Sequence, residues 1–194
     1  MRLLVVHCHP DPESYSAALR AAVMEGLAEA GHETRLIDLY AEGFDPVLTR
    51  EAWRAYPDSL LNQRGVEDHV EALLWAEGLV FVYPTWWYGL PAMLKGWLDR
   101  VWLPDVAFTL PPGRPIAPLL TQVRRLDVVT TCGASWWLTQ LVGSPGKRTL
   151  LRGCRFLMAK RCRTRFFAHY AMDSSTDASR ARFLRRVRRA MAAA

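Results

Sequence analysis

One short segment of the chain, bounded by Pro84 and Pro91, combines several aromatic side chains directly after an apolar run. The run Leu79–Tyr83 is typical of a buried strand. It is followed by Pro84, Thr85, Trp86, Trp87 and Tyr88. Aromatic rings at the carboxyl end of a buried strand suit the wall of a site for a flat ring, because open α/β sheets bind ligands at that edge. Packing of these rings under a neighbouring loop, or in a dimer contact, is the alternative.

A second segment, residues 9–16, joins an apolar strand to a helix. It places Ser14 and Ser16 at the opening of that helix, where free backbone N–H groups and the positive end of the helix dipole attract an anion. His9 ends the strand beside the same crevice. Taken singly, Ser14 is more often an ordinary N-cap and His9 a structural histidine. Together with an aromatic wall, they favour a ligand that joins a phosphate to a ring, such as a flavin nucleotide.

A third segment closes another apolar strand with small residues. Thr131, Cys132 and Gly133 allow the backbone to approach a ligand and to donate N–H bonds to it. Trp136 and Trp137 follow, and we expect them near a substrate pocket, although burial against an oligomer partner is the alternative. No base stands beside Cys132 in the sequence, so we interpret it as a small loop residue rather than a nucleophile.

These three segments need a scaffold that brings them together. The apolar runs Leu3–Cys8 and Leu79–Tyr83 predict two strands, and we expect three more at Thr34–Leu39, Leu126–Thr131 and Thr164–Tyr170. Helical periodicity or composition predicts helices at Ser16–Ala30, Val66–Ala76, Pro91–Trp102, Leu150–Met158 and Ser175–Ala190, with irregular chain over residues 40–65. The alternation predicts one α/β domain over residues 1–194: a doubly wound, flavodoxin-like parallel sheet of five strands in the order 2-1-3-4-5, with helices on both faces. The loops after strands one, three and four then meet at one edge.

Composition narrows the remaining possibilities. No apolar run reaches the roughly 18–20 residues of a membrane span, and no export signal precedes the first strand, so we expect a cytoplasmic protein. The four cysteines have no CxxC or metal-ligand spacing, which predicts reduced thiols and no metal site. No hydrolase elbow and no acid–base pair are evident. The sequence therefore supplies no protein-side catalyst, as expected where a redox cofactor carries the chemistry.

Charge is unevenly distributed along the chain. The net charge is +6, but residues 147–194 hold 14 Lys and Arg against two acids, Asp173 and Asp177. Such a basic end can favour nucleic acid, an anionic lipid surface or phosphorylated molecules. Residues 180–190 carry no interleaved aromatic pattern and no nucleic-acid motif, so we favour a solvated helix face and predict no nucleic-acid partner.

With these residues in place, the chain resembles the NAD(P)H:quinone oxidoreductase family. His9 with Ser14-Tyr15-Ser16 is similar to the family's first loop, a His followed by Ser-Phe-Asn. Tyr83-Pro84 through Lys95-Gly96-Trp97 resembles its long signature Phe-Pro-x-x-Trp-x-x-x-Pro-x-x-Leu-Lys-Gly-Trp, and Thr130-Thr131-Cys132-Gly133 resembles its Thr-Thr-Gly-Gly. The long signature is specific, and the resemblance extends from the first strand to beyond the fourth.

The resemblance implies a flavoprotein oxidoreductase with bound FAD or FMN. NAD(P)H would reduce the flavin, and a quinone or similar acceptor would then take the electrons in the same pocket of a homodimer. Residues of the first loop would hold the phosphate side, and those of the other two loops would line the ring: His9, Ser14, Tyr15, Ser16; Pro84, Thr85, Trp86, Trp87, Tyr88, Thr131, Cys132, Gly133. A flavin-binding regulatory subunit of a membrane transporter is the alternative function.

The chain also departs from that family pattern. Trp136 and Trp137 stand near the position of the family's catalytic Tyr, and no His occurs within residues 138–168, where the family's acid–base His lies. The catalytic residues therefore stay unassigned.

Overall fold

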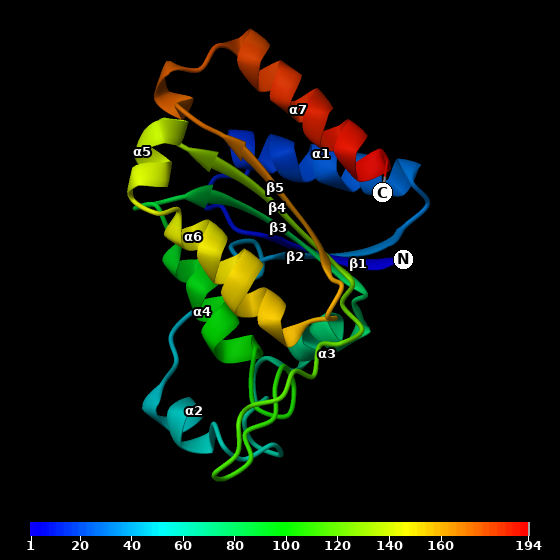
Figure 1. Cartoon of the computed structure of the whole chain (residues 1–194), viewed down its shortest axis with the longest axis vertical. Coiled ribbons are helices and arrows are strands. Elements are labelled where there is room, and N and C mark those ends of the chain that lie inside the picture. Colours follow the sequence, from blue (N-terminus) through cyan, green and yellow to red (C-terminus); the bar gives the residue numbers. More distant parts are fainter. Residues whose placement is uncertain (194) are drawn as a thin grey trace.

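A computed structural model describes residues 1–193 and shows a single sheet of five parallel strands (Figure 1). Its strand order is β2-β1-β3-β4-β5. The strands are β1 (Arg2–His7), β2 (Glu33–Asp38), β3 (Gly78–Thr85), β4 (Arg125–Cys132) and β5 (Arg163–His169). The predicted α/β fold and the predicted order 2-1-3-4-5 are therefore confirmed, with each strand within about two residues of its expected position.

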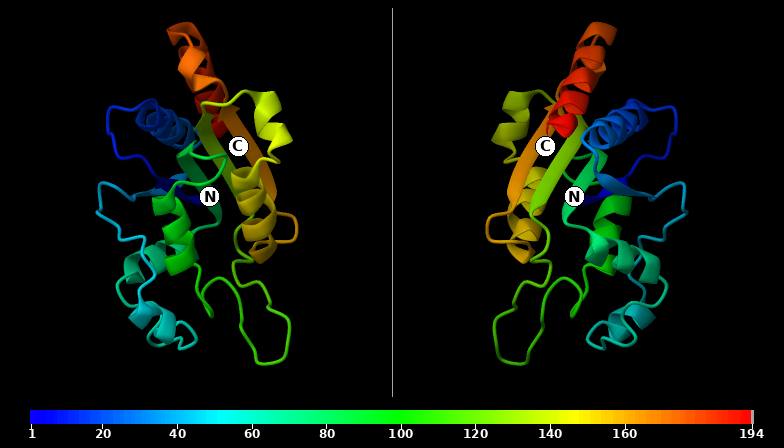
Figure 2. Two further views of the ribbon diagram at one scale, coloured as in Figure 1. Left: turned by 90° about the vertical axis from the view of Figure 1, so that its left-hand side faces the viewer. Right: turned by 90° about the vertical axis from the view of Figure 1, so that its right-hand side faces the viewer.

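Helices cover both faces of this sheet (Figures 1 and 2). Their bounds are α1 (Tyr15–Glu29), α2 (Arg50–Ala55), α3 (Glu67–Trp75), α4 (Ala92–Val101), α5 (Trp136–Leu141), α6 (Pro145–Arg148) and α7 (Asp177–Ala192). Alternate side chains of β1 enter two separate cores, as the two-residue period of a strand requires. Leu3 and Val5 pack against α1 and α7, whereas Leu4 and Val6 pack against α3 and α4.

The two helices on the first face are in direct backbone contact. A Cβ added at Gly26 in α1 would lie 2.4 Å from the carbonyl oxygen of Arg188 in α7 and 2.7 Å from the Cβ of Met191. Such distances leave no room for any side chain at position 26. Glycine at this position therefore permits the close packing of α1 on α7.

Several local elements differ from those that the sequence predicts. Residues 50–55, within the segment expected to be irregular, form α2, which Thr49 caps through a bond from Ala52 N–H to its hydroxyl. Residues 136–141, expected as part of a loop, form α5 with Ser135 as N-cap. The predicted helix at 150–158 is instead a π turn (Thr149–Gly153) followed by a 3-10 turn (Cys154–Leu157). Pro91 is the N-cap of α4 rather than its first helical residue.

No helix within residues 1–193 is both long enough and apolar enough to cross a membrane. A loop between α4 and β4 projects from the end of the sheet opposite α5 (Figure 1). The carboxyl ends of the strands thus remain free of this loop, and they form the edge at which the ligand segments were expected.

Candidate ligand site at the carboxyl edge of the sheet

A cavity of about 870 Å³ opens at the carboxyl edge of the sheet. We call it the rim cavity and define it by the residues that line it: His9, Tyr15, Ser16, Pro84, Thr85, Trp86, Trp87, Tyr88, Thr131, Cys132, Gly133, Ala134, Met172 and Asp173. Eleven of the twelve residues predicted to bind a cofactor are in this set. The fold thus brings the three predicted segments together around one space.

The aromatic side of the rim cavity is built on a strained turn. Trp87 and Tyr88 both have left-handed backbone conformations, with φ of 50° and 62°. The N–H of Gly89 donates to the carbonyl oxygen of Trp86 at 2.9 Å, which closes a four-residue turn around them. Bulky residues rarely adopt this conformation, which costs about 1–2 kcal/mol for each, and such strain concentrates at functional sites. Trp87, at the tip, is 96% exposed, so burial does not explain its position.

The base of this turn is fixed to the neighbouring strand. The hydroxyl groups of Thr85 and Thr130 are hydrogen-bonded at 2.8 Å, across the β3–β4 pair. The ring of Trp86 lies against that of His9 from the first loop, with centroids 6.3 Å apart and a tilt of 56° between the planes. The aromatic turn therefore faces the start of α1 across the rim cavity.

The start of α1 presents unpaired donors to the rim cavity. The first two helical residues, Tyr15 and Ser16, have no acceptor within residues 1–193 for their backbone N–H groups, as is usual for a first helical turn. Ser14 is the N-cap, and its hydroxyl accepts the N–H of Ala17 at 3.2 Å. The Nδ1 atom of His9 contacts the backbone of Asp11, which leaves its Nε2 atom for the cavity. An anion placed here would meet free donors and a favourable helix dipole.

The third side of the cavity comes from the end of β4. Cys132 is buried, and its Sγ lies 3.6 Å from the hydroxyl of Thr139, so its environment is that of a packed loop residue. A Cβ added at Gly133 would lie 3.0 Å from Oδ2 of Asp173. Position 133 therefore has little room for a side chain, and the loop after β5 closes over it.

Three lining residues were missed by the sequence analysis: Ala134, Met172 and Asp173. Met172 and Asp173 follow β5, whereas the ligand edge was expected to consist of the loops after strands one, three and four. The signal was available in the strand order. Since Thr131 of β4 is paired with His169 of β5, the chain that follows β5 must pass the same rim.

Three predicted residues are not among those that line the rim cavity. Ser14 has the capping role that such a serine most often has. Trp136 and Trp137 begin α5, pack edge to face with centroids 4.9 Å apart, and are 49% and 77% exposed. Their roles in binding flavin or substrate stay predictions.

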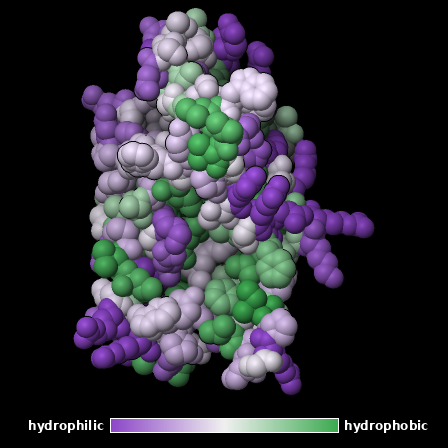
Figure 3. Space-filling model, turned by 60° about the vertical axis from the view of Figure 1, so that its left-hand side comes forward, coloured by the Kyte–Doolittle hydropathy of each residue, from purple (hydrophilic) through white to green (hydrophobic). Residues whose placement is uncertain are grey.

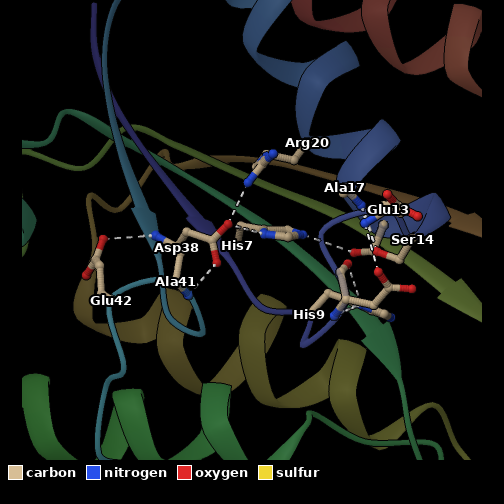
Figure 4. Close-up of polar contacts among 11 residues, drawn as sticks. His7, His9, Glu13, Ser14, Ala17, Arg20, Asp38, Ala41 and Glu42 are labelled. Carbon is tan, nitrogen blue, oxygen red and sulfur yellow. Dashed lines mark hydrogen bonds and ion pairs between the residues drawn. The ribbon is translucent and has the colours of Figure 1, made fainter.

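Behind the first loop lies a buried polar chain that the sequence analysis also missed (Figure 4). His7, the last residue of β1, is 1% exposed, and its Nδ1 lies 2.9 Å from Oδ2 of Asp38 in β2. Arg20 of α1 also donates to that carboxylate, at 2.5 Å. On its other side, the Nε2 atom of His7 lies 3.4 Å from the hydroxyl oxygen of Ser16.

These contacts shift both ionisable groups. Burial lowers the pKa of His7 and outweighs the carboxylate of Asp38, which acts to raise it. Burial alone would raise the pKa of Asp38, but the hydrogen bond and charge of His7, the Ala41 N–H and the Arg20 guanidinium together lower it. An ionised Asp38 paired with Arg20 beside a largely neutral His7 is the arrangement that follows.

The remaining candidate features are metal ligands and the basic residues near the end of the chain. Within residues 1–193, no group of three His, Cys, Asp or Glu side chains could hold a metal ion. The basic residues near the end of the chain lie on α7, where Arg182, Arg185 and Arg189 are exposed and Phe183 and Val187 are buried. This is the solvated face of an amphipathic helix, as the sequence indicated.

Comparisons with known proteins agree with this fold. The model of the Flavodoxin_2 family, described as a flavodoxin-like fold, matches residues 1–193. The chain is 29% identical over 173 residues to NAD(P)H dehydrogenase [quinone] 1 of Cavia porcellus, a match that covers 77% of this chain and 60% of the relative. The matches span between 44% and 60% of the length of the first curated relatives.

Solved structures are similar over the whole chain. Smu.1420 from Streptococcus mutans UA159 has a TM-score of 0.87 and 26% identity, and the alignment covers 100% of both chains. An NAD(P)H:quinone oxidoreductase from Methanothermobacter marburgensis has a TM-score of 0.80 and 28% identity over 99% of this chain and 96% of that one. With the family match, the five-stranded order and a loop-lined cavity at the carboxyl rim in agreement, the chain belongs to the Flavodoxin_2 family of flavodoxin-like proteins.

Proposed function

We propose that this protein is a flavin-dependent NAD(P)H oxidoreductase that passes two electrons, as hydride, from NAD(P)H through the flavin to a quinone or a similar acceptor. The observation that carries this proposal is the composition of the rim cavity. Free N–H donors of α1 stand on one side and a strained aromatic turn on the other, so one ligand with a phosphate and a flat ring can use both. The relatives named above support the same class of reaction.

The residues of the cavity fit a flavin nucleotide in separate ways. The N–H groups of Tyr15 and Ser16, with His9 beside them, would bind the phosphate end. Trp86, Trp87 and the backbone at Gly133 would enclose the ring, because small residues and aromatic faces both allow close approach to a planar ligand. The bound flavin supplies the redox chemistry, and the protein binds and orients it and its substrates.

The volume of the cavity is compatible with this role. About 870 Å³ lies in the upper part of the usual range for small-molecule sites, roughly 300–1,000 Å³, which leaves room beside a ring for a second reactant. NAD(P)H and the acceptor would then use the same face of the flavin in turn. We propose FAD or FMN as the bound cofactor.

A homodimer is part of the same proposal. The α5 region exposes a group of large apolar side chains: Trp136, Trp137, Leu138, Leu141 and Val142, of which Leu141 is 84% exposed. Figure 3 shows apolar side chains gathered in patches on this side of the molecule. Contiguous apolar surface of this kind is typical of protein interfaces. The face, which we call the α5 face, follows directly after the β4 loop of the cavity, so a partner subunit seated on it would help to enclose the ligand.

Purification and a steady-state assay test the proposed function. The purified protein should show flavin absorption bands, or acquire them on addition of FMN or FAD, and should oxidise NADH or NADPH with menadione as acceptor. Flavin binding with negligible turnover would favour the transporter-subunit alternative, which the enzyme names of the relatives do not favour. Absence of flavin binding would overturn the proposal. The cytoplasmic location stays a prediction.

A further inference from the structure

We propose that His7 is a positioning residue for the cofactor's phosphate: held by Asp38, it controls the direction in which the Ser16 hydroxyl donates its hydrogen bond. The inference rests on the proposed flavin site and concerns residues behind it. It starts from an unbroken chain of polar contacts, Asp38 Oδ2 to His7 Nδ1 at 2.9 Å and His7 Nε2 to Ser16 Oγ at 3.4 Å. Only Ser16, the last member of this chain, lines the rim cavity.

The carboxylate determines which nitrogen of His7 carries a proton. An ionised carboxylate only accepts hydrogen bonds, so Nδ1 of His7 donates to Asp38. Burial acts to raise the pKa of Asp38, but the hydrogen bond and charge of His7, the Ala41 N–H and Arg20 at 2.5 Å together lower it, so this carboxylate is ionised. In the neutral imidazole, the opposite atom, Nε2, then has no proton and acts as an acceptor.

The state of Nε2 decides what Ser16 presents to the cavity. When His7 is neutral, the Ser16 hydroxyl donates to Nε2, and its oxygen lone pairs are left toward a ligand. When His7 is protonated, Nε2–H donates to Ser16 Oγ, and the hydroxyl proton is free to bond a phosphate oxygen. An anion in the cavity therefore favours the second arrangement, and it also attracts the imidazolium charge. Binding of the phosphate and uptake of a proton by His7 are thus coupled.

The charged and titratable groups around His7 determine its protonation state before a ligand binds. Asp38 faces it from β2, Arg20 from α1 and His9 from the first loop, and Glu42 accepts the backbone N–H of Asp38 at 3.0 Å. Arg20 and His9 act to lower the pKa of His7, and so does burial, the largest effect. His7 is therefore largely neutral in the absence of ligand near pH 7. Binding of a phosphate can then be accompanied by uptake of a proton by His7.

Flavin affinity measured against pH tests the proposal. Dissociation constants are determined by quenching of flavin fluorescence between about pH 5.5 and about pH 8, with whichever of FMN and FAD the wild-type protein binds, and with riboflavin, which has no phosphate. The phosphate of FMN itself ionises near pH 6, so each variant is compared with the wild type at the same pH and the ligand's own titration cancels.

In the wild type, a His7 pKa raised by one unit on binding predicts that the affinity weakens by up to about tenfold, relative to His7→Gln, as the pH rises across this range. The glutamine amide does not titrate in this range, so its hydrogen bond to Ser16 is the same at every pH and the affinity of the variant should follow only the ligand. Ser16→Ala should remove the same dependence without altering the buried pair. Riboflavin should show no difference between wild type and variants, and His69→Gln, a matched change of a half-buried histidine outside the cavity, should keep the wild-type dependence.

Each other outcome is decisive. Identical pH dependence in wild type and His7→Gln overturns the inference while flavin binding, and the proposed function with it, still stands. A dependence that persists in Ser16→Ala shows that the charge of His7 acts through space, which also overturns the hydroxyl mechanism. If His7→Gln does not fold, Ser16→Ala and Asp38→Asn give the answer, because Asp38→Asn replaces a carboxylate that only accepts with an amide that can also donate, so the Nδ1 proton is no longer fixed. If the wild-type protein binds neither FMN nor FAD, both this inference and the proposed function are wrong.

Discussion

The backbone N–H of Gly146, near the start of α6, donates to the carbonyl oxygen of Tyr88 at 3.2 Å. This bond joins the chain beyond α5 to the strained turn that forms the aromatic side of the rim cavity. The contact is close enough that a Cβ at position 146 would lie 3.2 Å from the carbonyl carbon of Gly89 and 3.3 Å from its Cα. The position of the turn therefore depends on a glycine far from it in sequence.

Gly146→Ala should weaken flavin binding by displacing this turn. Both neighbouring groups are backbone atoms, so the added methyl can be accommodated only if the Trp86–Gly89 turn shifts by a few tenths of an ångström. We expect an affinity loss of about tenfold, since misplacement of a wall lowers complementarity across a flat ring. Flavin titration measures it. Gly153→Ala is the matched control, because its Cβ would meet nothing within 4 Å, and it should bind as the wild type does.

Replacement of Trp87 by Asn should stabilise the fold and impair binding at once. Asn tolerates the left-handed conformation with φ of 50°, and Trp87 is 96% exposed, so little packing is lost. The free energy of unfolding in urea should rise by about 0.5–1 kcal/mol. Flavin retention should fall, whereas Trp53→Ala, which alters an exposed Trp outside the cavity, should leave it unchanged. Unchanged retention in Trp87→Asn would exclude Trp87 from the ring site.

Asp127→Asn should be strongly destabilising. The carboxylate of Asp127 is completely buried between two guanidinium groups, Arg125 at 2.7 Å and Arg165 at 2.6 Å. Without this negative charge, the guanidinium groups of Arg125 and Arg165 lose their common anionic partner. Breaking a buried ion pair lowers the free energy of unfolding by about 3–5 kcal/mol. Chemical denaturation measures the loss. Asp99→Asn removes one partner of the exposed Lys95 pair and should change stability by less than about 1 kcal/mol.

Stability of the ligand-free protein should fall as the pH drops below 6.5, the usual pKa of histidine. Burial lowers the pKa of both His7 and His69, so in this window the unfolded chain binds protons that the folded chain does not. Urea unfolding at about pH 7.5 and about pH 5.5 measures the slope. His69→Gln should make it shallower. A slope that is flat in the wild type would contradict the assignment of both histidines as neutral.

Leu141→Glu should separate the proposed dimer into monomers. Leu141 is 84% exposed on the α5 face, and a buried charge without a partner is costly in any interface. Light scattering after size exclusion reports the mass. Leu60→Glu provides the control, since Leu60 is 89% exposed and lies outside α5. A wild type that elutes as a monomer at micromolar concentration would refute the dimer.

The strands were predictable because parallel strands covered on both faces consist of unbroken apolar residues. Leu79–Tyr83 has this pattern, and it lies in β3, the central strand of the sheet. The helices α2 and α5 were not predicted, since six residues are too few to show a helical period. Their N-caps, Thr49 and Ser135, were the signals available.

The candidate site was predictable to the extent that its residues are contiguous with strands. The lining residues after β1, β3 and β4 follow from topology alone. The pair formed by His7 and Asp38 depends on a contact between segments distant in sequence, which no local pattern reveals. The left-handed conformation of Trp87 is likewise invisible in the sequence, because residue type alone would argue against it.

The absence of a side chain at Gly26 has an effect at the far end of the same helix. Gly26 lies 11 positions after Tyr15 in α1, which corresponds to about 16 Å along the helix axis, and a helix is stiff over that length. Any bulkier residue at position 26 would have to push α1 away from Arg188, and the movement would tilt the amide donors at the opposite tip out of alignment with the aromatic turn. A substitution at Gly26 is therefore expected to lower the affinity for the ligand by moving α1, although Gly26 does not line the rim cavity.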